Sequence, residues 1–266
     1  MSNIALGRYI PLDSLIHKLD PRMKIIAMFF LLIAVFVPAG YPGYGVLGVF
    51  IVSVLLIAKL RLNFIFRAMK PMAFMLVFLL MINVLVLRTG YVLFSFYGFT
   101  VYSDAIYQTL YITFRLALMI MITTALTATT KPLDLTLAIE DLLGPLKRFG
   151  VPAHEIAMMI SIALRFIPTL IEETQRIMKA QASRGVDLKE GKFKEKIMAI
   201  LSLIVPLFVS SFQRAEDLAD AMEARGYVPS ATRTRYKQLK RTLKDYIMLF
   251  IVLLLLGGLI TLAFVV

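Results

Sequence analysis

The fold is decided by two long, similar segments, the first of which opens as Ala153-His-Glu-Ile-Ala-Met-Met-Ile-Ser-Ile-Ala-Leu-Arg-Phe-Ile-Pro168 and ends as Ala182-Ser-Arg-Gly185. The second begins near Phe193, carries an apolar run with Pro206 inside it, and ends as Glu223-Ala-Arg-Gly226. Each is apolar first and amphipathic later, which is typical of a helix that starts in apolar surroundings and ends in water. Roughly thirty helical residues span on the order of 45 Å. We therefore expect two long helices that reach from a membrane to a soluble partner.

The two segments share an arginine followed by a glycine at their ends. Arg184-Gly185 and Arg225-Gly226 lie 41 positions apart (225 minus 184). One such end is explained by helix capping, because a basic residue favours the last turn and glycine adopts the left-handed cap. Two ends on helices of similar length are not explained by capping alone, and a guanidinium suits forked hydrogen bonding to a carboxylate on another protein. The repeat predicts a partner with two lobes, or two related partner subunits.

The composition places the chain in a lipid bilayer. Of its 266 residues, 59% are hydrophobic and 17% are charged, and the mean hydropathy is +0.81, which is too apolar for a soluble globular domain. The first two apolar runs are shorter than the ~20 residues that a spanning helix needs. The chain has five apolar runs in all, at residues 25–37, 44–58, 71–87, 105–130 and 246–266. We expect an all-α polytopic membrane protein with about five transmembrane helices and a cytoplasmic domain of about three helices, the last two of them long.

Basic residues indicate the orientation of the chain. Lys and Arg gather before the first apolar run, between the second and third, and from residue 131 to 245, whereas the other connections are nearly uncharged. Cytoplasmic loops are enriched in basic residues, so we expect the N-terminus inside and the C-terminus outside. The same rule explains the formal net charge of +12 without a nucleic-acid partner. The predicted organisation is a membrane region at 1–130 with four spans, a cytoplasmic domain at 131–245 and a last transmembrane helix at 246–266.

Three further residues carry separate expectations. Pro168 and Pro206 stand where apolar sequence gives way to polar, and we expect each to kink or hinge its helix. Arg115 lies inside the fourth apolar run, where an unpaired charge is costly. We favour pairing of Arg115 with polar groups of neighbouring helices over a contact with a partner or a transported species.

Two connections are also informative. The aromatic and partly alternating stretch at 91–102 is either a short hairpin at the membrane interface or a lid over the outer face. The basic segment from Arg233 to Lys244 is expected to hold the cytoplasmic end of the chain at anionic head groups.

Candidate catalytic chemistry is confined to one acidic pair. Asp217 and Asp220, beside Glu216, resemble a metal-binding pattern of membrane prenyl-transfer enzymes. Arg214 stands one turn away, no second such pair exists, and residues at i and i+3 on a polar helix face are usually solvated or paired. The chain also has no cysteine and no glycine-rich phosphate loop, nucleophile elbow or His-Glu-x-x-His motif. We therefore expect no catalytic residue, no metal and no cofactor, and retain a metal-dependent lipid or prenyl transferase using Asp217 and Asp220 as the alternative function.

A self-sufficient channel or secondary carrier is a third possibility. It is weakened because only one ionisable side chain, Arg115, lies clearly within a span.

The chain resembles the transmembrane T component of energy-coupling factor transporters, the prokaryotic ABC-type importers of vitamins and metal ions. The resemblance covers nearly the whole length, and Ser183 stands where the family usually has alanine. The motifs that carry it are Leu15-Ile-His-Lys-Leu-Asp-Pro-Arg22, Thr129-Thr-Lys-Pro132, Ala163-Leu-Arg-Phe-Ile-Pro168, Ala182-Ser-Arg-Gly185 and Ala221-Met-Glu-Ala-Arg-Gly226.

The resemblance implies a non-catalytic coupling subunit in the plasma membrane of a prokaryote. Two ATPase subunits, identical or different, would dock at the helix ends, and a small hydrophobic substrate-binding S component would bind the membrane spans and the apolar face of the long helices. ATP-driven closure of the ATPases would then tilt the S component to release its vitamin or micronutrient, whose identity the S component decides. The implied ATPase-docking residues are Ser183, Arg184, Gly185, Ala224, Arg225 and Gly226.

Overall fold

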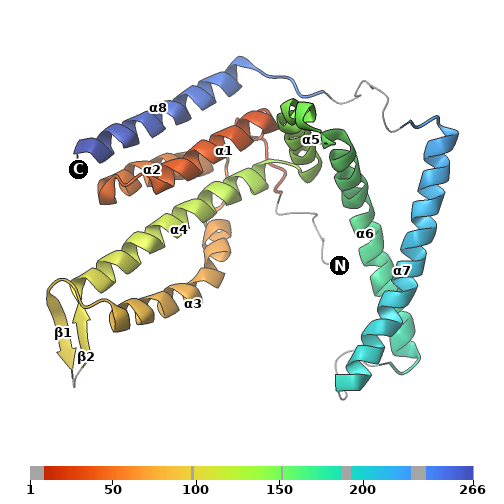
Figure 1. Cartoon of the computed structure of the whole chain (residues 1–266), viewed down its shortest axis with the longest axis horizontal. Coiled ribbons are helices and arrows are strands. Elements are labelled where there is room, and N and C mark those ends of the chain that lie inside the picture. The colour runs from red at the N-terminus through yellow and green to blue at the C-terminus, as the bar shows by residue number, and fades with distance from the viewer. Residues whose placement is uncertain (1–8, 97–98, 151, 187–192, 229–237, 266) are drawn as a thin grey trace. The chain divides into compact units, whose positions relative to one another are not determined.

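The computed structural model describes residues 9–96, 99–150, 152–186, 193–228 and 238–265. Within these residues the chain is almost entirely helical, with one short hairpin, so the predicted all-α fold is confirmed (Figure 1). The elements are α1 (Pro21–Phe36), α2 (Gly40–Ile57), α3 (Leu62–Val86), β1 (Val92–Phe96), β2 (Phe99–Tyr102), α4 (Ser103–Thr129), α5 (Pro132–Leu143), the 3-10 helix η1 (Gly144–Phe149), α6 (Ala153–Ser183), α7 (Phe193–Ala224) and α8 (Leu243–Val265).

The chain divides into two compact units. The larger unit comprises Gly7–Ala138 and Leu239–Val266, and the smaller unit comprises Ile139–Gln238 together with Met1–Leu6. The larger unit therefore holds α1 to α4 and α8, and the smaller unit holds η1, α6 and α7. The domain boundaries expected at 131 and 245 stay a prediction.

Six helices of the described chain are long and apolar enough to cross a membrane by length and composition, which makes this a multi-pass membrane protein. They are α2, α3 from Arg67 onward, α4, α6, α7 and α8. This set differs from the predicted one, because α1 has only 16 residues, about 24 Å of helix, while α6 and α7 qualify through their apolar first halves. The five-span arrangement stays a prediction. It depends on whether α6 and α7 lie in the cytoplasm or cross the membrane.

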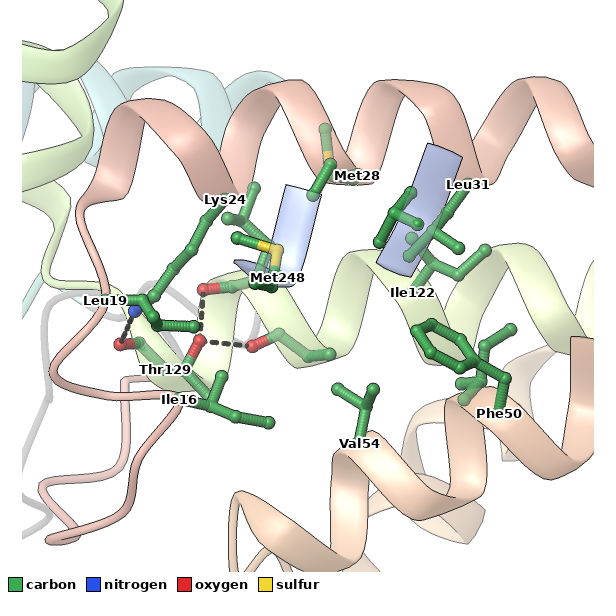
Figure 2. Close-up of a pocket in the computed structure, with 15 residues that line it drawn as sticks. Ile16, Leu19, Lys24, Met28, Leu31, Phe50, Val54, Ile122, Thr129 and Met248 are labelled. Carbon is green, nitrogen blue, oxygen red and sulfur yellow. Dashed lines mark hydrogen bonds between the residues drawn. The ribbon is translucent and has the colours of Figure 1, made fainter. Parts of the chain in front are cut away.

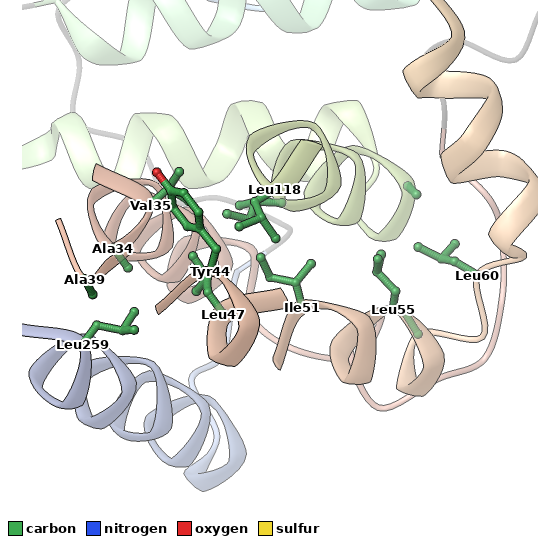
Figure 3. Packing of buried hydrophobic residues seen from close by; sticks show 13 residues of the cluster. Ala34, Val35, Ala39, Tyr44, Leu47, Ile51, Leu55, Leu60, Leu118 and Leu259 are labelled. Carbon is green, nitrogen blue, oxygen red and sulfur yellow. The ribbon is translucent and has the colours of Figure 1, made fainter. Parts of the chain in front are cut away.

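The core of the larger unit is organised around one stripe of α2. Tyr44, Leu47, Ile51 and Leu55 recur every three or four residues, so they share one helix face, and all are buried. Figure 3 shows this stripe facing side chains of α1, α4 and α8. Because the neighbours of α2 come from both ends of the sequence, the last helix is part of the membrane core.

Helix α3 packs almost solely along α4 and leaves the rest of its surface uncovered. None of its apolar window from Arg67 to Val86 is buried, and Asn83 donates its amide to Thr109 Oγ1 at 2.9 Å. Pro71 lies inside the helix, where it removes a backbone hydrogen bond and bends the axis. Figure 1 shows the sharp change of direction in α3.

The stretch at 91–102 forms an antiparallel hairpin. Val92 pairs with Tyr102 and Phe96 with Phe99, with an irregularity after Val92. One of the two predicted forms is therefore present, and its position relative to the membrane stays a prediction. The first part of the predicted basic segment, residues 233–237, and residues 187–192 of the link between the two long helices lie outside the described residues. Its later basic residues Lys240, Arg241 and Lys244 are described and exposed.

A polar cluster, buried at Asp20, Lys24 and Asp245, ties the start of α1 to α4 and α8. It consists of Asp20, Arg22, Lys24, Thr242 and Asp245. The Asp20 backbone N–H donates to Asp245 Oδ1 at 2.7 Å, and Arg22 donates to Asp20 Oδ2 at 2.7 Å and to the Leu239 carbonyl at 2.9 Å. Lys24 Nζ donates to the Thr129 carbonyl at 3.1 Å (Figure 2). The cluster thus joins segments more than a hundred residues apart.

Asp245 completes a capping arrangement at the start of α8. It accepts hydrogen bonds from the Thr242 backbone N–H at 2.6 Å and from Thr242 Oγ1 at 2.7 Å, and its side chain is fully buried. Threonine followed three residues later by an acid is the sequence pattern of a helix N-terminus. Nearby, burial of the Asp20 carboxyl raises its pKa, but hydrogen bonds from Arg22 outweigh this and hold the pKa below its usual range.

His17 is expected to make the stability of the larger unit depend on pH in mild acid. Its Nδ1 lies 2.7 Å from Ser14 Oγ and its Nε2 lies 3.0 Å from the Ile10 carbonyl. Burial lowers the pKa of His17 below 6.5. The hydrogen bond to the Ile10 carbonyl raises this pKa, but by less than burial lowers it. The folded chain therefore binds fewer protons than the unfolded chain just below pH 6.5, so stability is full above that pH and falls as the pH drops through the folded pKa.

We expect the thermal unfolding temperature of the detergent-solubilised protein to fall between pH 7.5 and pH 5.5. The His17→Gln variant is expected to lose part of this decrease, because its side chain does not titrate. Parallel melting curves for the two proteins at every pH would contradict the assignment to His17.

Candidate partner-docking site

The smaller unit is built on an antiparallel pair of long helices. Gln181 near the end of α6 donates its side-chain amide to the Ser202 carbonyl of α7 at 3.3 Å. Farther along, Arg214 of α7 forms an ion pair with Glu173 of α6 at 3.3 Å. Both contacts join the later half of α6 to α7, and Figure 1 shows the two helices crossing in this region.

Both helices end in the same backbone motif. At the end of α6, the Val186 N–H donates to the Gln181 carbonyl at 3.0 Å and the Gly185 N–H to the Ala182 carbonyl at 3.0 Å. These two bonds define a Schellman cap, which satisfies the last carbonyls of a helix.

The end of α7 repeats this cap bond for bond. The Tyr227 N–H donates to the Met222 carbonyl at 3.0 Å and the Gly226 N–H to the Glu223 carbonyl at 2.8 Å. In both caps the arginine is the last residue before the glycine, so each guanidinium is presented by the same local geometry.

Glycine is required in both caps because the backbone there has a positive φ, and not because neighbouring atoms leave no room for a side chain. Gly185 has φ of 82° and Gly226 has φ of 71°, in the left-handed region that a side chain disfavours. A Cβ at either position would meet no atom within 4 Å. Each glycine therefore lets the chain turn away from the helix axis and leaves the space around the arginine open.

The six predicted docking residues are all exposed, at two separate places. Ser183, Arg184 and Gly185 lie at the end of α6, and Ala224, Arg225 and Gly226 at the end of α7. Within the part of the chain that the structure describes, neither guanidinium has an ion pair or a hydrogen bond. The bonding capacity of both arginines is thus left for groups outside the described chain.

The antiparallel arrangement separates the two ends. Arg184 is three residues beyond Gln181, which contacts Ser202, and Arg225 lies 23 residues farther along α7 (225 minus 202). That length of helix corresponds to roughly 35 Å at 1.5 Å per residue. The two arginines therefore cannot enter one small site.

The other predicted residues lie within helices. Pro168 and Pro206 are inside α6 and α7, neither of which ends at its proline. The expected bend at each stays a prediction.

Arg115 is held by aromatic residues of three helices of the larger unit. Its Nε donates to Tyr44 Oη at 2.9 Å, and its guanidinium lies 5.4 Å from the ring centre of Phe36 and 5.1 Å from that of Tyr111. A cation over aromatic faces is stabilised without a carboxylate. Sequence reasoning missed Tyr44 and Tyr111; the available signal was the presence of tyrosine inside two apolar runs.

The acidic pair of the alternative function lies on the surface of α7. Asp217 and Asp220 are both exposed, and within the described residues no group of three His, Asp or Glu side chains is arranged to hold a metal ion. The structure thus brings no further acidic ligand to this pair.

One polar contact of the smaller unit was not anticipated. His154 Nδ1 lies 2.9 Å from Glu140 Oε1, which is nearly buried, and this contact ties α6 to the end of α5.

Comparisons with known proteins agree on one family. Residues 13–236 match the family described as "Cobalt transport protein". The chain is 44% identical over 245 residues to the "Energy-coupling factor transporter transmembrane protein EcfT" of Bacillus subtilis (strain 168), covering 92% of each chain. Proteins of the same name from Staphylococcus aureus (strain 04-02981) and Lactococcus lactis subsp. cremoris (strain MG1363) are 42% and 40% identical, covering 94–96% of each chain.

Proposed function

Because the chain belongs to the family of transmembrane components of energy-coupling factor transporters, we propose that it couples two ATPase subunits to a substrate-binding S component. Arg184 and Arg225 are the residues proposed to dock into the ATPases, each with the small residue before it and the glycine after it. The chain itself contributes no catalytic group, and ATP hydrolysis belongs to the partner subunits.

The observation that carries this proposal is the pair of matching helix ends. Two exposed arginines sit in identical caps at opposite ends of an antiparallel helix pair, on the order of 30 Å apart. Identical caps suit identical or related binding grooves, and the separation suits one groove on each of two subunits. An exposed guanidinium without a partner in the described chain can form a forked hydrogen bond with a carboxylate.

Uncovered apolar surface supports a membrane partner as well. Phe74 and Val77 of α3, and Phe208 and Phe212 of α7, expose between 62% and 83% of their surface. Large exposed apolar surfaces mark contacts with lipid or with another protein. We assign part of these faces to a small hydrophobic S component that captures a vitamin or another micronutrient.

Motion would pass through the helix pair. When the ATPases close on ATP, the two docked ends are displaced relative to each other, and the crossing contacts Gln181–Ser202 and Glu173–Arg214 transmit this displacement along both helices. Tilting of the S component would then open its binding site to the cytoplasm. In this arrangement the protein lies in the plasma membrane of a prokaryote with its N-terminus in the cytoplasm and its C-terminus outside.

Gentle detergent purification of the tagged chain from its native cells tests this function. We expect mass spectrometry to identify two ATPase subunits, or two copies of one, together with a small hydrophobic membrane protein. A chain that purifies without ATPase subunits and shows a divalent-metal-dependent transferase activity lost in Asp217→Asn would instead support the alternative function. Solute flux through the purified chain without ATP would also contradict the proposal.

A further inference from the structure

We propose that the groove between α3 and α4 is a binding site for an anionic phospholipid. The groove has a volume of about 500 Å³ and lies wholly within the larger unit. Arg67 and Lys70 line one part of it, and the apolar residues Met69 and Leu76 of α3 and Ala117 of α4 line the rest. A lipid offers the matching chemistry, since its phosphate is anionic and its acyl chain is apolar.

The cationic part of the groove is formed by two exposed side chains on one helix face. Arg67 and Lys70 are three residues apart, so they are neighbours on the surface of α3. Within the described residues neither has an ion pair or a hydrogen bond, so their charges are not satisfied by this chain. A phosphate can accept hydrogen bonds from both, and arginine can bind it through two N–H groups at once.

The position along α3 matches the depth of a lipid head group. The apolar window of this helix runs from Arg67 to Val86, so Arg67 and Lys70 stand in its first turn and Leu76 stands deeper. Basic side chains at the end of a spanning helix reach the polar surface of the bilayer while their stems remain in its apolar part. The two cations therefore lie at the depth of the phosphate of a phospholipid, and the apolar wall lies at the depth of its acyl chains.

The bend of α3 and the small residues of α4 explain why the groove exists. Pro71 lies inside α3, where proline favours a bend, and Figure 1 shows that α3 changes direction along its length. Ala117 offers only a methyl group, and Thr113 uses its hydroxyl to donate to the Thr109 carbonyl at 2.7 Å. The opening is therefore filled by no side chain of α4 and is left to the surrounding bilayer.

Charge complementarity favours an anionic lipid over other occupants. A zwitterionic lipid carries a cation of its own beside the phosphate, which repels Arg67 and Lys70. Free phosphate would use the two cations but none of the apolar wall. Each basic residue near an anionic lipid surface contributes roughly 1 kcal/mol, which for two residues corresponds to about a 30-fold change in binding.

The test is native mass spectrometry of the full chain with phosphatidylglycerol and, separately, with phosphatidylcholine. We expect preferential retention of phosphatidylglycerol, and at least tenfold weaker retention in the double variant Arg67→Gln/Lys70→Gln. The matched control is Lys59→Gln/Arg61→Gln, which removes the same charge from two exposed positions in the connection before α3. The control is expected to keep phosphatidylglycerol binding within about twofold of wild type.

A second variant tests the apolar part without changing charge. Ala117→Trp places a bulky side chain in the groove and is expected to reduce phosphatidylglycerol binding while Arg67 and Lys70 remain. Equal loss in the control double variant, or unchanged binding in Ala117→Trp, would overturn the site. Full displacement of the lipid by inorganic phosphate would also overturn the site. The same holds if Arg67→Gln/Lys70→Gln loses a protein partner while its lipid binding is unchanged.

Discussion

The double variant Arg184→Ala/Arg225→Ala is expected to lose ATPase association and ATP-driven uptake while it remains in the membrane. Truncating one side of a desolvated, hydrogen-bonded charge pair costs about 2–5 kcal/mol, much of it from the carboxylate left unpaired on the partner. Each single variant should therefore weaken association by about 30-fold or more. Copurification of ATPase subunits with the tagged chain, together with uptake into cells, measures both effects.

Two controls separate docking from folding. Arg176→Ala removes another exposed arginine of α6, whose side chain is 78% exposed and only loosely paired with Glu173 at 3.8 Å. It should leave association unchanged, because exposed ion pairs contribute little. Arg184→Lys keeps the charge but not the planar fork and should fall between wild type and alanine. Wild-type uptake and ATPase association in both single alanine variants would rule out docking through these residues.

The second large effect is expected on stability, from Asp245→Ala. This side chain accepts hydrogen bonds from the backbone N–H groups of Asp20 and Thr242 and from the Thr242 hydroxyl. Removing it leaves the buried Asp20 N–H without an acceptor, which costs about 1–3 kcal/mol, and also removes the helix-capping bonds to the exposed Thr242. We expect the thermal unfolding temperature to drop by on the order of 5–10 °C.

Asp220→Ala is the matched control, because this substitution also removes one carboxylate, but from an exposed position on α7. It should shift the unfolding temperature by no more than about 2 °C, in line with other exposed substitutions. A similar drop in both variants would show that the buried cluster is not what stabilises the larger unit.

The parts of the fold that sequence could predict are local. The apolar-then-polar pattern before Arg184 and before Arg225 predicts two long helices, and glycine after arginine predicts where each one ends. The structure has both helices and both ends, because these signals depend only on neighbouring residues.

Non-local pairings were missed. Asp20 and Asp245 are 225 residues apart, and Arg115 and Tyr44 are 71 apart, so no periodicity connects them. The Thr242-x-x-Asp245 spacing was the one local clue to the first pair. The number of spans could not be predicted with certainty either, because hydropathy alone does not decide whether the apolar halves of α6 and α7 cross the membrane.

The polar cluster at the start of α1 also holds both places where the chain connects the larger unit to the rest of the protein. Lys24 donates to the carbonyl of Thr129, which lies shortly before the chain leaves the larger unit after Ala138. Arg22 donates to the carbonyl of Leu239, the residue at which the chain returns to this unit. Both connections are therefore bonded to the same turn of α1. Tension on either covalent connection is therefore received by the same short helix. Under the proposed function, a displacement passed along either connection would act on this part of α1, so weakening the cluster is expected to reduce ATP-driven uptake.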